Sequence, residues 1–159
     1  MIKLTLIVLS KRREKYLCDG SDEYEKRLSR YCKLQIVELE PERLPENPSK
    51  SQIDGALAAE GAAILKKIPA GAFVTALCVE GKRMSSEEFS ELITAKSPAA
   101  GGLVFIIGSS YGIHDSVKSA AHLKLSASDM TFPHQLFRIM LLEQIYRGFK
   151  IEEGGKYHK

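Results

Sequence analysis

The sequence predicts an α/β fold in which helices sandwich a mostly parallel β-sheet. Segments with the patterns of strands alternate with segments that have helical periodicity along the whole chain. Two strand-like segments, Phe73–Val79 and Leu103–Ile107, are apolar almost throughout, which is typical of parallel strands covered on both faces. With 159 residues, no internal repeat and no linker-like stretch, the chain is expected to form a single domain, residues 1–159.

Short runs that are β-branched, alternating or continuously apolar are expected to form the strands. These runs are residues 2–9, 33–40, 73–79, 103–107 and 123–126. Between the second and third of them lies Pro41–Pro48, where three prolines in eight residues leave no regular ladder. This segment is therefore expected to be a loop.

Apolar residues that recur at spacings of three and four predict the helices. The helical segments are residues 22–33, from Ser49 or Ser51 to about 67, from about 85 to about 95, about 115–121, and 133 to about 149. Ser85-Ser86-Glu87-Glu88 has the pattern of a capping box, and Pro133 is typical of a first helical turn.

The composition indicates a soluble globular protein, with 44% apolar and 27% charged residues and a net charge of +3. This mildly basic charge permits a nucleic-acid partner without requiring one. The three cysteines form no CxxC pair, so we expect reduced thiols and a cytoplasmic protein. No apolar run approaches the length of a membrane span, and the four histidines show no metal-binding spacing, so neither a membrane nor a metal is expected.

Ligands of parallel α/β sheets bind beyond the carboxyl ends of the strands. Three segments fall there: Leu77–Gly81, Gly108–Gly112 and Leu125–Phe132. The second, GSSYG, lacks both the GxGxxG pattern and the lysine of a Walker loop. It is either a ligand-binding turn, in which glycine lets the backbone approach a ligand, or a plain turn between strand and helix.

The segment before the last helix also has two interpretations. Its hydroxyl and carboxylate side chains can cap the helix that follows Pro133. Alternatively, Met130 and Phe132 offer apolar contacts to a flat ligand beside exposed backbone donors. His134 either packs as a neutral imidazole in the first turn or faces a ligand. Arg138, four residues on, is either a surface arginine or a phosphate contact.

Several short motifs, taken in order, resemble one family. They are Glu23-Tyr24-Glu25-Lys26-Arg27-Leu28, Glu80-Gly81-Lys82, Gly108-Ser109-Ser110-Tyr111-Gly112, Leu125-Ser126, Thr131-Phe132-Pro133-His134-Gln135, Leu142-Glu143-Gln144-Ile145-Tyr146-Arg147 and terminal Tyr157-His158-Lys159. Their order and spacing are similar to those of the ribosomal RNA large subunit methyltransferase H family, small members of the SPOUT (α/β-knot) methyltransferases. The likeness covers essentially the whole chain.

The resemblance implies a homodimer whose C-terminal part forms a trefoil knot in each chain. It implies S-adenosylmethionine as cofactor and N3 of a pseudouridine in 23S rRNA, within the assembled ribosome, as the target of methylation. The cofactor-binding residues that it implies are Leu77, Gly108, Ala127, Ser128, Asp129, Met130, Thr131 and Phe132.

The same resemblance suggests His158 or Tyr157 for the group that positions the base or takes its proton, and Arg138 for a charge that holds a phosphate or developing oxyanion. Lys11, Arg12, Arg13 and Lys15 are candidate phosphate contacts. Relatives commonly have glycine where this chain has Ser109, which is harmless only if the φ angle there is negative. The alternatives are a non-catalytic RNA- or nucleotide-binding α/β module and a flavodoxin-like protein. For the latter, Lys11-Arg12-Arg13-Glu14 is a poor phosphate loop.

Overall fold

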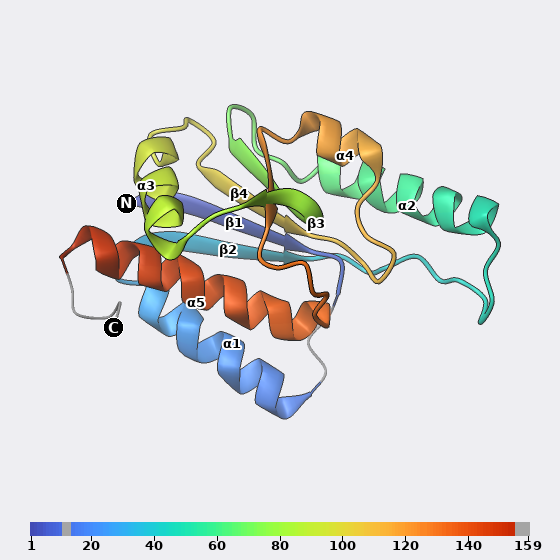
Figure 1. Cartoon of the computed structure of the whole chain (residues 1–159), viewed down its shortest axis with the longest axis horizontal. Coiled ribbons are helices and arrows are strands. Elements are labelled where there is room, and N and C mark those ends of the chain that lie inside the picture. The colour runs from blue at the N-terminus through green and yellow to red at the C-terminus, as the bar shows by residue number, and fades with distance from the viewer. Residues whose placement is uncertain (11–13, 155–159) are drawn as a thin grey trace.

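The computed structural model describes residues 1–10 and 14–154 of the 159-residue chain. Strands and helices alternate along the described residues, as the sequence predicts (Figure 1). The strands are β1 (Ile2–Val8), β2 (Cys32–Glu38), β3 (Phe73–Arg83), β4 (Leu103–Ile107) and β5 (Leu123–Ser126). The helices are α1 (Lys15–Leu28), α2 (Lys50–Leu65), α3 (Ser86–Lys96), α4 (Asp115–Ala120) and α5 (His134–Glu152).

The strands form one five-stranded sheet in the order β2-β1-β4-β3-β5. Every neighbouring pair is parallel, which confirms the predicted α/β class. Because all strands run the same way, their carboxyl ends lie along one edge of the sheet, where ligands of such folds bind. Within the described helices, none is both long and apolar enough to cross a bilayer.

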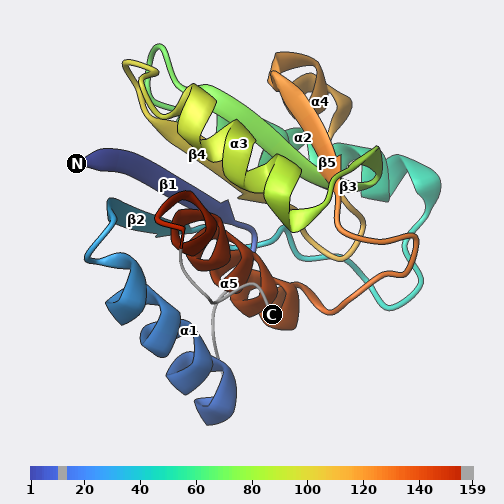
Figure 2. The same cartoon turned by 60° about the vertical axis from the view of Figure 1, so that its left-hand side comes forward.

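Helices cover both faces of the sheet, α1, α3 and α5 on one side and α2 and α4 on the other (Figures 1 and 2). Side chains of β4 alternate between the two cores. Phe105 belongs to the core that includes Leu142 and Ile145 of α5, whereas Ile106 belongs to the core that includes Ile64 of α2. A strand buried on both faces needs apolar residues at every position, which explains the run LVFII.

Helix α1 departs from the prediction: it spans Lys15–Leu28, not residues 22–33. Its first half contains Gly20 and has little local preference for a helix. A Cβ on Gly20 would lie 2.9 Å from Cδ1 of Ile139, so this glycine lets α1 approach α5 closely. Leu17 and Ser21 are buried on the same helix. Tertiary packing against α5 thus imposes a helix that local propensity does not specify.

Strand β3 extends to Arg83, beyond the predicted end at Val79. Both Leu77 and Lys82 pair with Leu125 of β5, so Cys78–Gly81 is an irregular excursion of the strand. A Cβ on Gly81 would lie 2.6 Å from the carbonyl carbon of Leu125, which only glycine avoids.

The helix starts follow the sequence signals closely. Ser49, not Ser51, caps α2 in a capping box with Gln52, and Ser85 forms the predicted box with Glu88. Pro133 directly precedes α5, which begins at His134. The trefoil knot, and the assignment of residues 1–159 to a single domain, stay predictions.

Candidate active site

A cavity of about 630 Å³ lies at the carboxyl ends of β3, β4 and β5. Its size is typical of small-molecule sites. It is enclosed by the excursion of β3, the loop after β4, helix α4, the loop after β5 and the first turn of α5. The lining residues are Leu77–Glu80, Ile107–Ile113, Lys118, Leu125–Ser128, Met130–His134 and Phe137.

The loop Gly108–Gly112 forms one wall and is tightly folded. The Gly112 N–H donates to the Ser109 carbonyl at 2.9 Å, and Gly112 has a φ of 100°, a conformation that favours glycine. A Cβ on Gly108 would meet the Gly112 carbonyl oxygen and lie 2.6 Å from Cγ1 of Ile113. No residue other than glycine in the described ranges has positive φ, so Ser109 fits without strain.

The loop after β5 is held by its own serines. The Ser126 hydroxyl donates to the Ser128 carbonyl at 3.0 Å, and the Met130 N–H donates to the Ser128 hydroxyl at 3.0 Å. Phe132 stacks on Phe137 of α5 with ring centroids 6.5 Å apart. Met130 remains 72% exposed, so this loop presents apolar surface at the mouth of the cavity.

Two ion pairs border the cavity. Lys118 of α4 binds Glu80 on the β3 excursion, and this contact raises the pKa of Lys118 and lowers that of Glu80. Arg83 lies 3.0 Å from Asp129, and both side chains are largely exposed. The pairs connect β3 to α4 on one side and to the loop after β5 on the other.

Among the titratable side chains that line the cavity, those of His134 and Cys78 have pKa values shifted by burial. Burial lowers the pKa of His134, so the imidazole is neutral at pH 7, and its Nε2 lies 3.4 Å from the Ser110 hydroxyl. Burial and the charge of Glu80 raise the pKa of Cys78, so this residue is a thiol and not a thiolate nucleophile.

The structure brings most of the predicted cofactor-binding residues to this cavity. Its lining includes Leu77, Gly108, Ala127, Ser128, Met130, Thr131 and Phe132. Asp129 is absent from the lining because its carboxylate turns outward to Arg83. Both GSSYG and the β5–α5 loop form cavity wall. The predicted capping of α5 by hydroxyl or carboxylate side chains is wrong, because Pro133 occupies the cap position without a side-chain hydrogen bond and the loop serines bond within the loop.

Arg138 lies elsewhere. Its side chain is 1% exposed, and Nη1 is 3.5 Å from Oε2 of Glu38 at the end of β2. An arginine buried in this way is neither the expected surface residue nor an open phosphate contact. Tyr157 and His158 lie outside the described residues, as do Lys11, Arg12 and Arg13.

Sequence reasoning missed two residues of the site, Lys118 and Glu60. Glu60 does not line the cavity, but its Oε2 accepts a hydrogen bond from the Ser109 hydroxyl at 2.7 Å. One signal for it was present: Glu60 is the sole charged residue between Asp54 and Lys66, in an otherwise apolar helical run. Lys118 had no comparable signal, because its relation to Glu80 depends on the sheet order.

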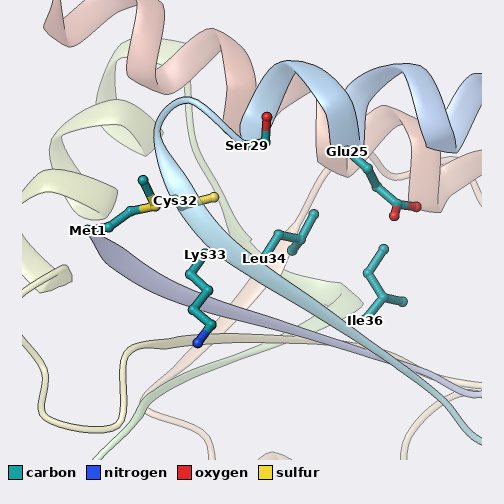
Figure 3. Close-up of a pocket in the computed structure, with 7 residues that line it drawn as sticks. All are labelled: Met1, Glu25, Ser29, Cys32, Lys33, Leu34 and Ile36. Atoms are coloured by element: carbon teal, nitrogen blue, oxygen red, sulfur yellow. The ribbon is translucent and has the colours of Figure 1, made fainter.

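A second hollow of about 370 Å³ lies between α1 and the edge strand β2 (Figure 3). Glu25 of α1 stands above Leu34 and Ile36 of β2 there. Burial raises the pKa of Cys32, in the same hollow, to about 11, so its thiol is unreactive. Among the described residues, no loop from a strand's carboxyl end lines this hollow, and the larger cavity is therefore the candidate active site.

Within the ranges 1–10 and 14–154, no group of three or more His, Cys, Asp or Glu side chains is arranged to hold a metal ion. The larger cavity instead combines apolar walls, from Leu77, Ile113 and Leu125, with backbone groups and serine hydroxyls. Such a lining suits an organic ligand that has a flat ring and polar substituents.

Comparisons with known proteins point in one direction. Residues 2–158 match the family described as "Predicted SPOUT methyltransferase". The chain is 50% identical, over 159 residues, to the protein named ribosomal RNA large subunit methyltransferase H of Clostridium beijerinckii, with 99% of this chain and 100% of the relative covered. Proteins of the same name from Clostridium kluyveri and Leuconostoc mesenteroides are 48% and 46% identical, each with the same coverage of both chains.

Proposed function

Because the chain belongs to the SPOUT methyltransferase family, we propose that it is an S-adenosylmethionine-dependent methyltransferase of large-subunit ribosomal RNA. In full, the proposed reaction is methylation of N3 of a pseudouridine in 23S rRNA within the assembled ribosome. The names of the relatives support the ribosomal RNA substrate. The choice of pseudouridine N3 in the assembled ribosome as the target is inferred only from the resemblance of the sequence motifs to those of the family.

The observation that carries the proposal is the cavity at the carboxyl ends of β3, β4 and β5. Segments far apart in the sequence, at Leu77, Gly108 and 127–132, form its walls together. Apolar side chains there suit an adenine ring, and the backbone groups of both loops suit its polar substituents. The charge of Glu80 at the rim is balanced by Lys118, and the carboxylate of Glu60 lies behind Ser109, on the side that would favour a positively charged sulfonium.

S-adenosylmethionine, when bound, would supply a methyl group activated by the positive sulfur, and the sulfur would leave as a neutral thioether. The contribution of the protein is then mainly positioning and electrostatics. The loops Gly108–Gly112 and 127–132 are proposed to hold the cofactor, and Phe132 and Phe137 to exclude water from its apolar side. Neutral His134 adds no positive charge to a pocket for a cation.

The N3 atom of the base loses its proton as the new N–C bond forms. We propose that His158 or Tyr157 accepts this proton or positions the base. His158→Ala is expected to lower the rate constant for methylation of ribosomes at saturating cofactor by a factor on the order of 10²–10⁴, as for loss of a general base. A wild-type rate would remove His158 from the mechanism, and the same test applied to Tyr157→Phe separates the two residues.

Calorimetric titration with S-adenosylmethionine tests the proposal directly. The wild-type protein is expected to bind the cofactor, and Gly108→Ala to lose binding, because the added Cβ would collide with Gly112 and Ile113. Gly55→Ala is the matched control, since a Cβ on Gly55 of α2 has nothing within 4 Å. A wild-type protein that does not bind would leave the non-catalytic RNA-binding module as the better explanation.

The proposal includes a homodimer in the cytoplasm, where ribosomes are found. A sheet edge at β2 and exposed apolar side chains near the cavity, such as Met130 and Leu136, are available for contact with a second copy. Light scattering behind size exclusion is expected to give twice the chain mass of 17.6 kDa. A monomer at micromolar concentration would contradict this part of the proposal.

A further inference from the structure

A buried acid stands behind the loop that forms one wall of the cavity. Glu60, on α2, is 5% exposed. It belongs to the helices on the face opposite α5, yet its carboxylate reaches the loop after β4. Polar groups with such burial are retained in a stable fold only when they are hydrogen-bonded.

The carboxylate of Glu60 accepts from two neutral donors. Oε2 accepts from the Ser109 hydroxyl at 2.7 Å, and Oε1 accepts from the Glu42 N–H at 3.4 Å. No ion pair to Glu60 is present among residues 1–10 and 14–154. The shorter contact, from hydroxyl to carboxylate, has the length of a strong charge-assisted hydrogen bond.

Ser109 is the link between this acid and the cavity. Its side chain turns away from the cavity to Glu60, while its backbone lines the cavity between Gly108 and Ser110. The Ser109 carbonyl accepts from the Gly112 N–H, the bond that closes the loop. Glu60 is therefore connected, through one side chain, to the backbone that shapes this wall.

We propose that Glu60 is a positioning residue for the active site, which acts through Ser109 to fix the backbone of Gly108–Gly112 in the shape that receives the methyl donor. This inference rests on the proposed function of the cavity as the S-adenosylmethionine site. Glu60 touches no reacting atom. It fixes the position of the wall formed by Gly108–Gly112, in the way that residues behind a binding site restrict the conformations of the residues that touch the ligand.

Binding of S-adenosylmethionine to Ser109→Ala and Glu60→Gln tests the proposal. Ser109→Ala is expected to raise the Kd about fivefold, which corresponds to about 1 kcal/mol for one lost hydrogen bond. Glu60→Gln keeps one oxygen acceptor and is expected to show a smaller increase. The double variant is expected to have the same Kd as Ser109→Ala alone, because Ser109→Ala already removes the one interaction that Glu60→Gln weakens.

Ser21→Ala is the matched control. Ser21 is fully buried on α1, and its hydroxyl donates to Glu25 at 2.9 Å, so the same kind of bond is lost between two residues that do not line the cavity. Its Kd is expected to equal that of the wild type. In turnover, Ser109→Ala is expected to raise the KM for the cofactor while kcat at saturation changes less than twofold. A general loss of stability would not produce this split.

Failure of the wild-type protein to bind S-adenosylmethionine would overturn the proposed function. Amide hydrogen exchange at Gly112 tests the effect of Glu60 on the loop separately, because it needs no bound cofactor. The Gly112 amide is expected to exchange roughly tenfold faster in Ser109→Ala than in the wild type or in Ser21→Ala. Unchanged exchange at Gly112, or a Kd for Ser109→Ala within twofold of the wild type, overturns the positioning role.

Discussion

At the scale of single residues, burial decides roles that residue type leaves open. Arg138 belongs to a residue type enriched on surfaces and at phosphates, but here it ranks among the largest fully buried side chains. Its ion pair with Glu38 joins α5 to the end of β2. We propose that its role is to hold these two elements together.

Arg138→Met removes the charge but keeps most of the side-chain volume. It is expected to lower the free energy of unfolding by about 3 kcal/mol, at the low end for a broken buried pair because Glu38 keeps contact with water. Urea denaturation measures the change. Lys15→Met, which breaks the exposed pair with Asp19, is the control and is expected to change stability by less than about 0.5 kcal/mol. Equal effects of the two substitutions would refute the structural role.

The burial of Glu60 predicts how the stability of the fold changes with pH. Burial raises the pKa of this carboxyl above its ordinary value of 4.5, although the hydrogen bonds from Ser109 and the Glu42 N–H oppose the shift. A raised pKa means that the folded state disfavours the ionised form. The contribution of Glu60 to stability is therefore fully present below pH 4.5 and is lost as the pH rises through the folded-state pKa.

Glu60→Gln does not titrate at this position. The stability of the variant relative to the wild type is therefore expected to be higher at pH 8 than at pH 4, because only the wild type loses stability as Glu60 ionises. Denaturation at both values of pH, with Ser21→Ala to monitor unrelated pH effects, measures the difference. A difference that stays constant, or that changes in the opposite direction, contradicts the raised pKa.

At the scale of elements, glycines determine how closely neighbouring segments approach. Gly20 brings α1 against α5, and Gly81 brings the excursion of β3 against the backbone of β5. Neither glycine has positive φ, so the constraint at each is space and not backbone conformation. At Gly81 the close atoms are backbone and only glycine fits, whereas at Gly20 the close atom is the end of the Ile139 side chain, which can shift. These contacts explain why α1 starts earlier than local propensity suggests, and why β3 extends past its apolar run.

Gly81→Ala tests the approach of β3 to β5. The new Cβ would lie 2.6–2.7 Å from backbone atoms of Leu125 and Lys124, which cannot rotate away. The substitution is expected to lower the free energy of unfolding by about 1–3 kcal/mol, as overpacking does, and to weaken cofactor binding. Gly55→Ala, in open space on α2, is expected to raise stability by about 1 kcal/mol. Thermal melts of both variants, followed by calorimetry, provide the comparison.

At the scale of the whole molecule, size and charge limit how the protein recognises RNA. A chain of 159 residues with a net charge of +3 offers little surface with which to recognise the base sequence of a flexible RNA strand. We therefore expect the substrate to be a folded ribosomal surface. Initial methylation rates on intact ribosomes are expected to exceed those on a short naked 23S fragment by at least tenfold, and equal rates would contradict this expectation.

Local sequence patterns were enough to predict the alternation of strands and helices, the capping box at Ser85, and the segments that form the cavity. These features depend on local chemistry: hydrophobic period, capping hydroxyls, and the positions of glycine and proline. The parallel class also followed, because only strands covered on both faces need to be apolar throughout. Most of the expected cofactor-binding residues reach the cavity for the same reason, since each follows a strand whose place was recognisable.

Features that depend on which elements become neighbours could not be predicted from local patterns and follow from the three-dimensional fold. The sheet order β2-β1-β4-β3-β5 brings Glu80 to Lys118 and moves Arg138 beside Glu38. The packing of α2 behind the loop after β4 brings Glu60 to Ser109, across 49 positions of sequence. No local sequence pattern predicts these contacts, because the free energy of burying a charge or forming a contact depends on the whole fold around it.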